Sequence, residues 1–281
     1  MKITFLGTGS AFAVQNYNTS FLLETHQENK MLFDAGGDLR HALHAAGCTH
    51  RDACEAIFIS HIHGDHMGGL EYLAFISHFD PDVTHKPYLY AHKDDLEKIW
   101  KMISPSVSRL TNKLLSLDDY FDVMELHSST RFFPTGHHIG CEPDGFACEM
   151  IPLIHFYDGS ENFISHGLFL QEEGPEMDPI GDPILITGDC QFGSNQKTLM
   201  PYYREAGFII HDCETYPGKS GAHAHYDELS TLPPEIKGKM ILTHFQDNVM
   251  DDPSGWSRKA KQDGFLGFAF PGMVWENGKW K

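Results

Sequence analysis

Six consecutive residues, His61 to His66, carry four side chains of types that bind metal ions. They read His-x-His-x-Asp-His and directly follow an apolar run, Ala56–Ser60. His61 and His63 can face one cation from a turning loop, and Asp65 and His66, next along the chain, can face a second. Imidazole together with carboxylate suits zinc, manganese or iron better than calcium. At this chain's own His and Asp frequencies, chance yields such a run in under roughly one sequence in a hundred, so the pattern predicts a metal centre.

Further polar side chains stand at the ends of other apolar runs. These residues are His155, Asp189, His211, Asp212 and His244. Groups at strand ends can converge on one rim of a sandwich of sheets, where loops reach solvent and ligands bind. We therefore expect them to lie at one rim of the fold where a ligand binds.

Strand-like and helix-like patterns must position these side chains. Several strand-like runs are apolar throughout, as expected for strands covered on both faces. The predicted strands are Ile3–Leu6, Ser20–Glu24, Met31–Phe33, Ala56–Ser60, Tyr88–Ala91, Met150–His155, Leu168–Gln171, Ile184–Thr187, Phe208–His211, Met240–Thr243 and Phe268–Phe270. The predicted helices are Asp38–Ala46, Gly69–Phe79, Lys93–Leu115 and Gln196–Ala206, with Ser194 and Asn195 as capping residues of the last. Two groups of strands interleaved with helices predict an α/β chain of one domain, residues 1–281, in which two sheets pack face to face with helices outside.

Composition narrows the class of protein. Lys and Arg number 21 against 39 Asp and Glu, a formal net charge of −18, which disfavours long nucleic acid and anionic membrane as partners. We expect no signal peptide and no membrane span. The six cysteines lack a CxxC spacing or a secreted framework, so we expect free thiols in a cytoplasmic protein. The 19 histidines exceed what packing needs and favour a metalloprotein.

The His61–His66 run and its context resemble the metallo-β-lactamase superfamily, whose members share this signature and a four-layer αββα sandwich. The resemblance implies a centre of two divalent ions, zinc ahead of manganese or iron, that share a hydroxide. It places the first ion on His61, His63 and His155 and the second on Asp65, His66 and His244, and it makes Asp189 a bridging ligand.

Three other places with histidine compete with these assignments. His137 and His138 lie between Pro-Thr-Gly and Ile-Gly, which is typical of a loop or hairpin, so we favour His155 as the third ligand. His92 and His166 also end apolar runs, and we interpret both as structural histidines.

Three further stretches resemble the ribonuclease Z branch of that superfamily. Gly-Thr-Gly-Ser-Ala and Phe-Asp-Ala-Gly-Gly follow the first and third predicted strands, and His-Asp-Cys-Glu-Thr-Tyr begins at His211. The resemblance makes His223 the residue that contacts the scissile phosphate and Asp212 its supporting carboxylate, with Glu214 as the alternative. Asp65 belongs to the catalytic set as well. A solvated helix cap is the other interpretation of His223 and His225.

The chain departs from ribonuclease Z in lacking a long basic tRNA-binding arm between His155 and Asp189. Only 33 residues lie between them (189 − 155 − 1), and they include the acidic stretch Gln171–Asp178. We therefore expect a small phosphodiester such as a cyclic nucleotide as substrate. The alternatives are a tRNA 3′-processing endonuclease and a lactonase or thioesterase. The basic residues of the segment from His92 to Leu117 indicate a lid or the surface of a homodimer.

Overall fold

The computed structural model describes residues 1–110, 112–134, 145–174 and 178–281. His137, His138 and Cys141 lie outside these ranges, so the competing ligand pair is not placed. The other five cysteines are free, as predicted.

The first sheet has the strand order β17–β16–β1–β2–β3–β4–β5–β8. The strands from β17 to β3 pair antiparallel, and those from β3 to β8 pair parallel. Their bounds are β1 (Lys2–Gly7), β2 (Ser20–Glu24), β3 (Lys30–Phe33), β4 (Ala56–Ile59), β5 (Tyr88–His92), β8 (Asp122–Leu126), β16 (Val274–Glu276) and β17 (Lys279–Trp280).

The second sheet has the strand order β15–β14–β13–β12–β11–β10–β9. The strands from β12 to β15 pair parallel, so their carboxyl ends meet at one edge of the sheet. Their bounds are β9 (Arg131–Phe132), β10 (Gly145–Tyr157), β11 (Asn162–Glu173), β12 (Pro179–Ile186), β13 (Phe208–Asp212), β14 (Met240–Thr243) and β15 (Gly267–Phe268).

Apolar side chains fill the space between the two sheets. Phe5, Phe21, Phe33 and Phe58 form a row across β1 to β4, with neighbouring ring centroids 5.2 to 5.7 Å apart. Residues of the second sheet such as Ile186 pack against the same cluster. Because successive side chains of a strand point to opposite faces, the central strands that are apolar throughout also have a second buried face for helices to cover.

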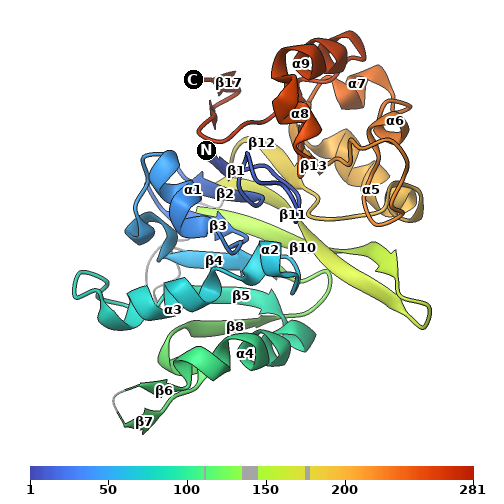
Figure 1. The fold of residues 1–281 in the computed structure, drawn as a ribbon. Helices are drawn as coiled ribbons and strands as arrows, with labels where there is room; N and C mark the ends of the chain where they lie inside the picture. Colours follow the sequence, from blue (N-terminus) through green and yellow to red (C-terminus); the bar gives the residue numbers. More distant parts are fainter. Residues whose placement is uncertain (111, 135–144, 175–177) are drawn as a thin grey trace.

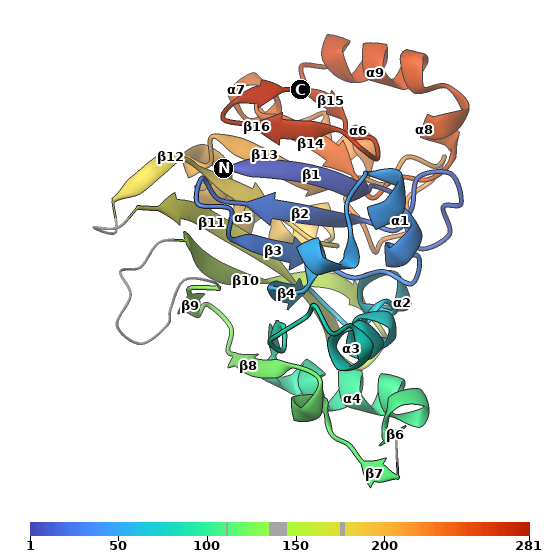
Figure 2. The same cartoon turned by 90° about the vertical axis from the view of Figure 1, so that its left-hand side faces the viewer.

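Helices cover the outer face of each sheet (Figures 1 and 2). The first sheet is covered by α1 (Leu39–Ala45), α2 (Gly64–Met67), α3 (Leu70–Phe79) and α4 (Lys93–Val107), with the 3-10 turns η1 (His50–Ala53) and η2 (Leu117–Asp119). The second sheet is covered by α5 (Phe192–Glu205), α6 (Tyr226–Leu229), α7 (Pro234–Lys237), α8 (Asn248–Asp251) and α9 (Pro253–Gln262). The four-layer αββα sandwich is thus confirmed. In the described ranges no helix combines the length and the apolar character that crossing a membrane requires.

Most predicted elements have somewhat different bounds in the structure, and three of these differences are large or involve candidate residues. The helix predicted over Lys93–Leu115 ends at Val107, and a small hairpin follows, β6 (Arg109–Leu110) and β7 (Lys113–Leu114). Asn112 in the hairpin turn has φ 62°, a conformation that Asn tolerates well. The helix predicted over Gln196–Ala206 begins at Phe192, so Ser194 and Asn195 lie inside it and do not cap it. His155 does not end a strand, because β10 continues to Tyr157.

Candidate metal centre

One group of candidate ligands comes from the loop after β4, from strand β10 and from the loop after β12. It comprises His61, His63, His155 and Asp189, which we call the first group. Each offers one ligand atom, and these atoms all lie within 4.8 Å of one another. His61 Nε2 lies 2.9 Å from His63 Nδ1, and Asp189 Oδ2 lies 3.6 Å from His155 Nε2. The three histidines that the sequence assigned to the first ion are therefore together.

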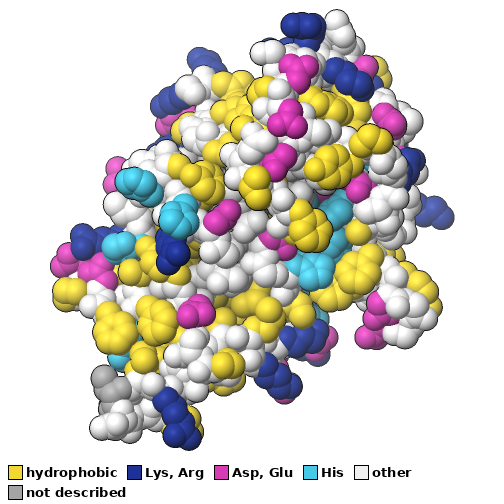
Figure 3. All heavy atoms as spheres, viewed as in Figure 1, with side chains coloured by type: hydrophobic (Ala, Val, Ile, Leu, Met, Phe, Trp, Pro, Cys, Tyr) yellow, Lys and Arg dark blue, Asp and Glu magenta, His cyan; other side chains and the backbone are white. Residues whose placement is uncertain are grey.

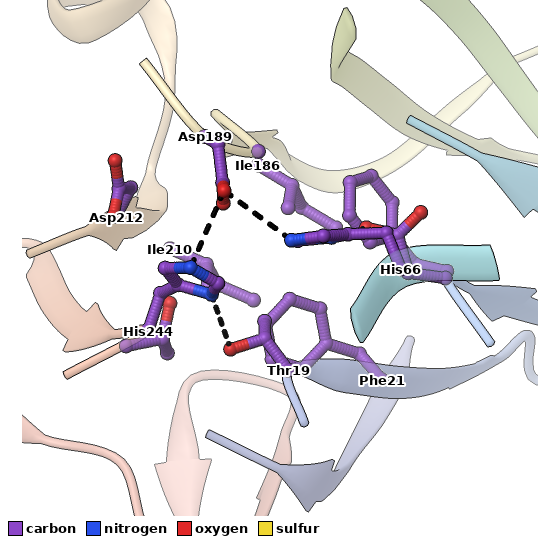
Figure 4. Close-up of a pocket in the computed structure, with 12 residues that line it drawn as sticks. Thr19, Phe21, His66, Ile186, Asp189, Ile210, Asp212 and His244 are labelled. Carbon is purple, nitrogen blue, oxygen red and sulfur yellow. Dashed lines mark hydrogen bonds and ion pairs between the residues drawn. The ribbon is translucent and has the colours of Figure 1, made fainter. Parts of the chain in front are cut away.

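The second group comprises Asp65, His66, Asp189 and His244, and its ligand atoms also lie within 4.8 Å of one another. His66 Nε2 lies 3.2 Å from Asp65 Oδ2, and both His66 and His244 place Nε2 at 3.3 Å from Asp189 Oδ2. Figure 4 shows Asp189 between His66 and His244. Asp189 thus belongs to both groups, which is the arrangement that a bridging ligand requires.

The far nitrogens of four histidines are held by hydrogen bonds outside the cluster. His66 Nδ1 bonds Asp34 Oδ2 at 2.7 Å, and His244 Nδ1 bonds Thr19 Oγ1 at 3.1 Å. His61 Nδ1 bonds the neighbouring Ser60 hydroxyl at 3.0 Å. The fourth contact, 2.8 Å long, joins His155 Nδ1 to the carbonyl of Ala222. Partners of this kind set the orientation of metal-ligating imidazoles, and here they direct each Nε2 into the cluster.

Local backbone geometry places two of the ligands. His244 follows β14 with φ 59°, an uncommon conformation for a residue other than glycine, and this turns its ring toward Asp189. His155 lies at an irregularity of β10 between Ile154 and Phe156, where the pairing with β11 shifts register. Such bulges redirect a side chain. Buried Asn195 holds the strand there, since its amide bonds both the N–H and the carbonyl of Ile154.

Electrostatics fit divalent cations at this place. Burial would raise the pKa of Asp189, but His244 and His66 outweigh it and hold that pKa well below its ordinary value. Burial opposes protonation of His66, but Asp189, Asp65 and Asp34 raise its pKa well above the usual range. The protein alone thus compensates buried carboxylates with protons, which a cation can replace.

The donor atoms pass a second test. His66 Nε2 is buried without a hydrogen-bond partner although it faces the carboxylates of Asp65 and Asp189. A cation between this nitrogen and the two carboxylates would give it a partner. The set consists of imidazole nitrogens and carboxylate oxygens, a combination that zinc, manganese and iron accept. The residues present therefore fit two such ions, and that they bind them stays a prediction.

His223 lies at the edge of the cluster, in the loop between β13 and α6. Its Nδ1 is 3.1 Å from Asp212 Oδ2 and 3.8 Å from Asp189 Oδ2. Glu214, the alternative partner, instead accepts a hydrogen bond from the Ser220 N–H. Burial opposes protonation of His223, but Asp212 and Asp189 outweigh it and raise the pKa to about 10. Of the two candidate carboxylates, Asp212 is thus the one that contacts His223, and its supporting role stays a prediction.

Three other histidines that the sequence singled out, His92, His166 and His225, lie outside the two ligand groups. His225 caps the N-terminus of α6, where its Nδ1 accepts a hydrogen bond from the Asp227 N–H, so the cap interpretation fits His225 and not His223. His166 is buried, bonds the Ser60 carbonyl through Nδ1 and stacks on His92 with centroids 4.8 Å apart. Both are outside the groups described above, in agreement with their structural interpretation.

Sequence reasoning assigned no role to Asp34 and Thr19, and it interpreted Asn195 as a helix cap and not as a support of the site. Asp34 follows the apolar run that forms β3, the same strand-end signal that pointed to Asp189. That signal would have found Asp34, although it could not have shown that the carboxylate faces His66. Thr19 and Asn195 carry no such signal, because their partners lie 225 and 41 residues away.

Relatives of known description match nearly the whole chain. Residues 1–275 match the family described as Anti-Pycsar protein Apyc1. A protein of that description from Bacillus phage 010DV004 is 29% identical over 262 residues, covering 89% of this chain and 91% of the relative. One from Paenibacillus sp. (strain J14) is 30% identical over 251 residues, with the same coverage.

Solved structures agree on the fold. The metallo-β-lactamase fold protein YhfI from Bacillus subtilis superposes with a TM-score of 0.70 at 19% identity, covering 98% of each chain. The short form of human tRNase Z has a TM-score of 0.67 at 21% identity and covers 99% of each chain. Unliganded yeast PDE1 gives 0.65 at 10% identity, covering 97% of this chain and 98% of its own. With the metallo-β-lactamase fold established and the family match spanning residues 1–275, the chain belongs to the Anti-Pycsar protein Apyc1 family.

Proposed function

We propose that this protein is a binuclear metal-dependent phosphodiesterase that hydrolyses small phosphodiesters, with 3′,5′-cyclic nucleotides as the substrate class. The observation that carries the proposal is the His223–Asp212 pair, 3.1 Å apart, at the edge of the two ligand groups. A hydrolase that cleaves lactones or thioesters needs the two groups but not this additional imidazole and carboxylate. Membership of the Apyc1 family and the likeness to a structure titled PDE1 support the same reaction class.

Each of the two groups would hold one divalent ion through its histidines and carboxylates, and Asp189 belongs to both groups. When bound, two such ions supply a nucleophile at neutral pH and neutralise charge on phosphoryl oxygens. Most of the ligand atoms come from buried side chains; His63 and Asp65 are partly exposed and face the open side of the cluster. A phosphodiester approaching from that side meets His63, Asp65 and His223.

His223 supplies the proton chemistry. Its Nδ1–H donates to Asp212 Oδ2, which also accepts from the Cys190 N–H at 3.0 Å, so the carboxylate is fixed from two directions. This leaves the Nε2–H of the imidazolium to donate to a phosphoryl oxygen or to the departing alkoxide. General acid catalysis by a positioned imidazole contributes typically about 10²–10⁴-fold.

The segment between the ligands His155 and Asp189 favours a small substrate. Residues 156–188 contain no Lys or Arg, and their hairpin tip carries Asp158 and Glu161. Phosphate contacts supply most of the affinity for long nucleic acid, and this segment has no cation to make them. A single phosphate bound at the cluster is not subject to that limit.

The test is hydrolysis by purified protein loaded with zinc or manganese. The substrates are a panel of 3′,5′-cyclic nucleotides with different bases, bis-p-nitrophenyl phosphate, a precursor tRNA and a lactone, with Asp65→Ala as control. We expect turnover of the cyclic nucleotides and none of the tRNA. Absence of phosphodiester turnover above the Asp65→Ala control would overturn the proposal, and cleavage of the lactone alone would assign the site to another hydrolase class.

A further inference from the structure

One aromatic side chain touches every histidine of the first group. The Phe163 ring lies parallel to the His63 ring, with centroids 4.8 Å apart and planes at 6°. Its contacts with His61 and His155 are T-shaped, with ring centroids 6.0 Å apart in each pair. No contact between Phe163 and the histidines of the second group appears among the described ring pairs.

Phe163 belongs to the hairpin of strands β10 and β11, which extends past the cluster. Its cross-strand partner is Phe156, whose ring lies at 4.9 Å and 10°. Phe156 also faces His63 with near-parallel planes, at 5.9 Å. The far end of the hairpin projects from the body of the molecule in Figure 1, and Figure 3 shows hydrophobic side chains bordering the histidines at the surface. The two phenylalanines therefore form a flat wall against His63.

His63 differs from the other proposed histidine ligands in how it is held. Those four each have a hydrogen bond at Nδ1, which leaves Nε2 for the cluster. His63 instead turns Nδ1 toward His61, and its Nε2 has no hydrogen-bond partner among the described residues. The partly exposed His63 ring thus depends on its face-to-face contact for orientation. Offset-stacked rings of this kind stabilise each other beyond the area they bury.

We propose that Phe163 is a positioning residue for the first group: it holds the three imidazoles, His63 above all, in the geometry that binds the first metal ion. The proposal rests on the metal centre of the proposed function and does not depend on the substrate. Phe163 takes the role that Asp34 and Thr19 have at the second group. Its ring blocks rotation of His63 and keeps water from the side of the first group that faces the hairpin.

The experiment measures metal binding and not turnover. Co²⁺ is added stepwise to the metal-free wild type and to metal-free Phe163→Leu and Phe163→Tyr. The visible absorption bands of the bound Co²⁺ are recorded at each step. Leu keeps apolar volume but loses the flat face, whereas Tyr keeps the face. Phe169→Leu is the matched control, because Phe169 is also a partly exposed phenylalanine on β11 but packs against Tyr202, away from the cluster.

We expect two bound Co²⁺ ions in the wild type. In Phe163→Leu one ion should bind about 10–100-fold more weakly, the range for partners that orient metal ligands, with altered absorption bands, while the other keeps its affinity. Phe163→Tyr should restore binding to within a few fold of the wild type. Phe169→Leu should bind as the wild type does.

Each contrary result has a definite meaning. Unchanged affinity for both ions in a folded Phe163→Leu would overturn the positioning role, as would equal weakening of both ions or failure of Tyr to rescue. Circular dichroism checks that each variant is folded. If Phe163→Leu is unfolded, Phe163→Tyr is compared with Phe169→Leu instead. Loss of one ion in Phe163→Tyr would also overturn the positioning role. A wild type that binds no Co²⁺ would overturn the metal centre itself, and with it both proposals.

Discussion

The two ligand groups share Asp189 but are supported by different parts of the molecule. In the second group, buried oxygen atoms of the first sheet and its neighbouring loop hold the imidazoles: Asp34 bonds His66, and Thr19 bonds His244. In the first group, the supports are an adjacent hydroxyl, the loop carbonyl of Ala222 and the aromatic face of a long hairpin. One group is thus fixed from within the core and the other from a hairpin and a loop.

This difference predicts unequal metal sites. A buried charge-assisted hydrogen bond, such as that from His66 to Asp34, is stronger and more directional than stacking between partly exposed rings. We therefore expect the ion of the second group to bind more tightly and that of the first group to leave first.

Asp189→Ala should damage both groups at once. The variant removes the one oxygen within 3.3–3.8 Å of His61, His66, His155 and His244. We expect hydrolysis to fall to background and less than one ion to remain per chain, measured by elemental analysis after gel filtration. Retention of one ion at wild-type affinity would show that Asp189 serves only one group.

His223→Ala should leave both metals in place and reduce turnover. The expected loss of kcat is about 10²–10⁴-fold, because a proton donor is removed and no ligand of either group is changed. Steady-state kinetics and metal content are measured together. His225→Ala is the control, since His225 caps α6 two residues away and should affect stability more than turnover. Loss of one ion in His223→Ala would make His223 a ligand, as its closeness to Asp189, Asp212 and His244 permits.

Asp34→Asn should weaken the second group selectively. Asp34 has φ 59°, which Asn also tolerates, so the backbone is preserved while the charge that faces His66 is removed. Affinity for one ion should fall by about 10–100-fold, read out by competition with a chromogenic chelator. A smaller change is expected at the other ion, because Asp34 also accepts from Ser60, which contacts His61. The comparison of the groups fails if the first group's ion loses more affinity than the second group's ion.

Asn195→Ala should weaken the first group through His155, with the smallest effect of the four. The substitution leaves the partly buried N–H of Ile154 without its acceptor, a loss of about 1 kcal/mol in the free energy of unfolding. Thermal unfolding with and without chelator measures the two effects. We expect a lower Tm in both conditions and a metal affinity reduced for one ion only. An equal loss for both ions would contradict separate supports.

Local sequence predicted the elements and most of the cluster. The ligands of the His61–His66 run lie within six residues after β4, so one turn brings them together whatever the rest of the chain does. The apolar runs located the central strands, because burial on both faces leaves a local signature. Short elements such as β8, β16 and the helices α6 to α8 were missed, since their patterns are too short to show a period.

The residues that the sequence left open depend on contacts between distant segments. Asp212 and Glu214 are two positions apart, and only the path of the loop from β13 to α6 decides that Asp212 faces His223. Likewise, nothing local indicates that Phe163 faces His63, a hundred residues earlier, because the register of β11 on β10 and the packing of the two sheets set that contact.

Residue types and apolar runs were thus enough to identify the candidate metal ligands, Asp189 included, and the central strands. Packing between distant segments was needed to show that Asp212 contacts His223 and that the Phe163 ring stacks on His63. The physical reason is range: residue type and periodicity act over one turn or strand, whereas a contact of 3–5 Å between segments depends on how every intervening element packs.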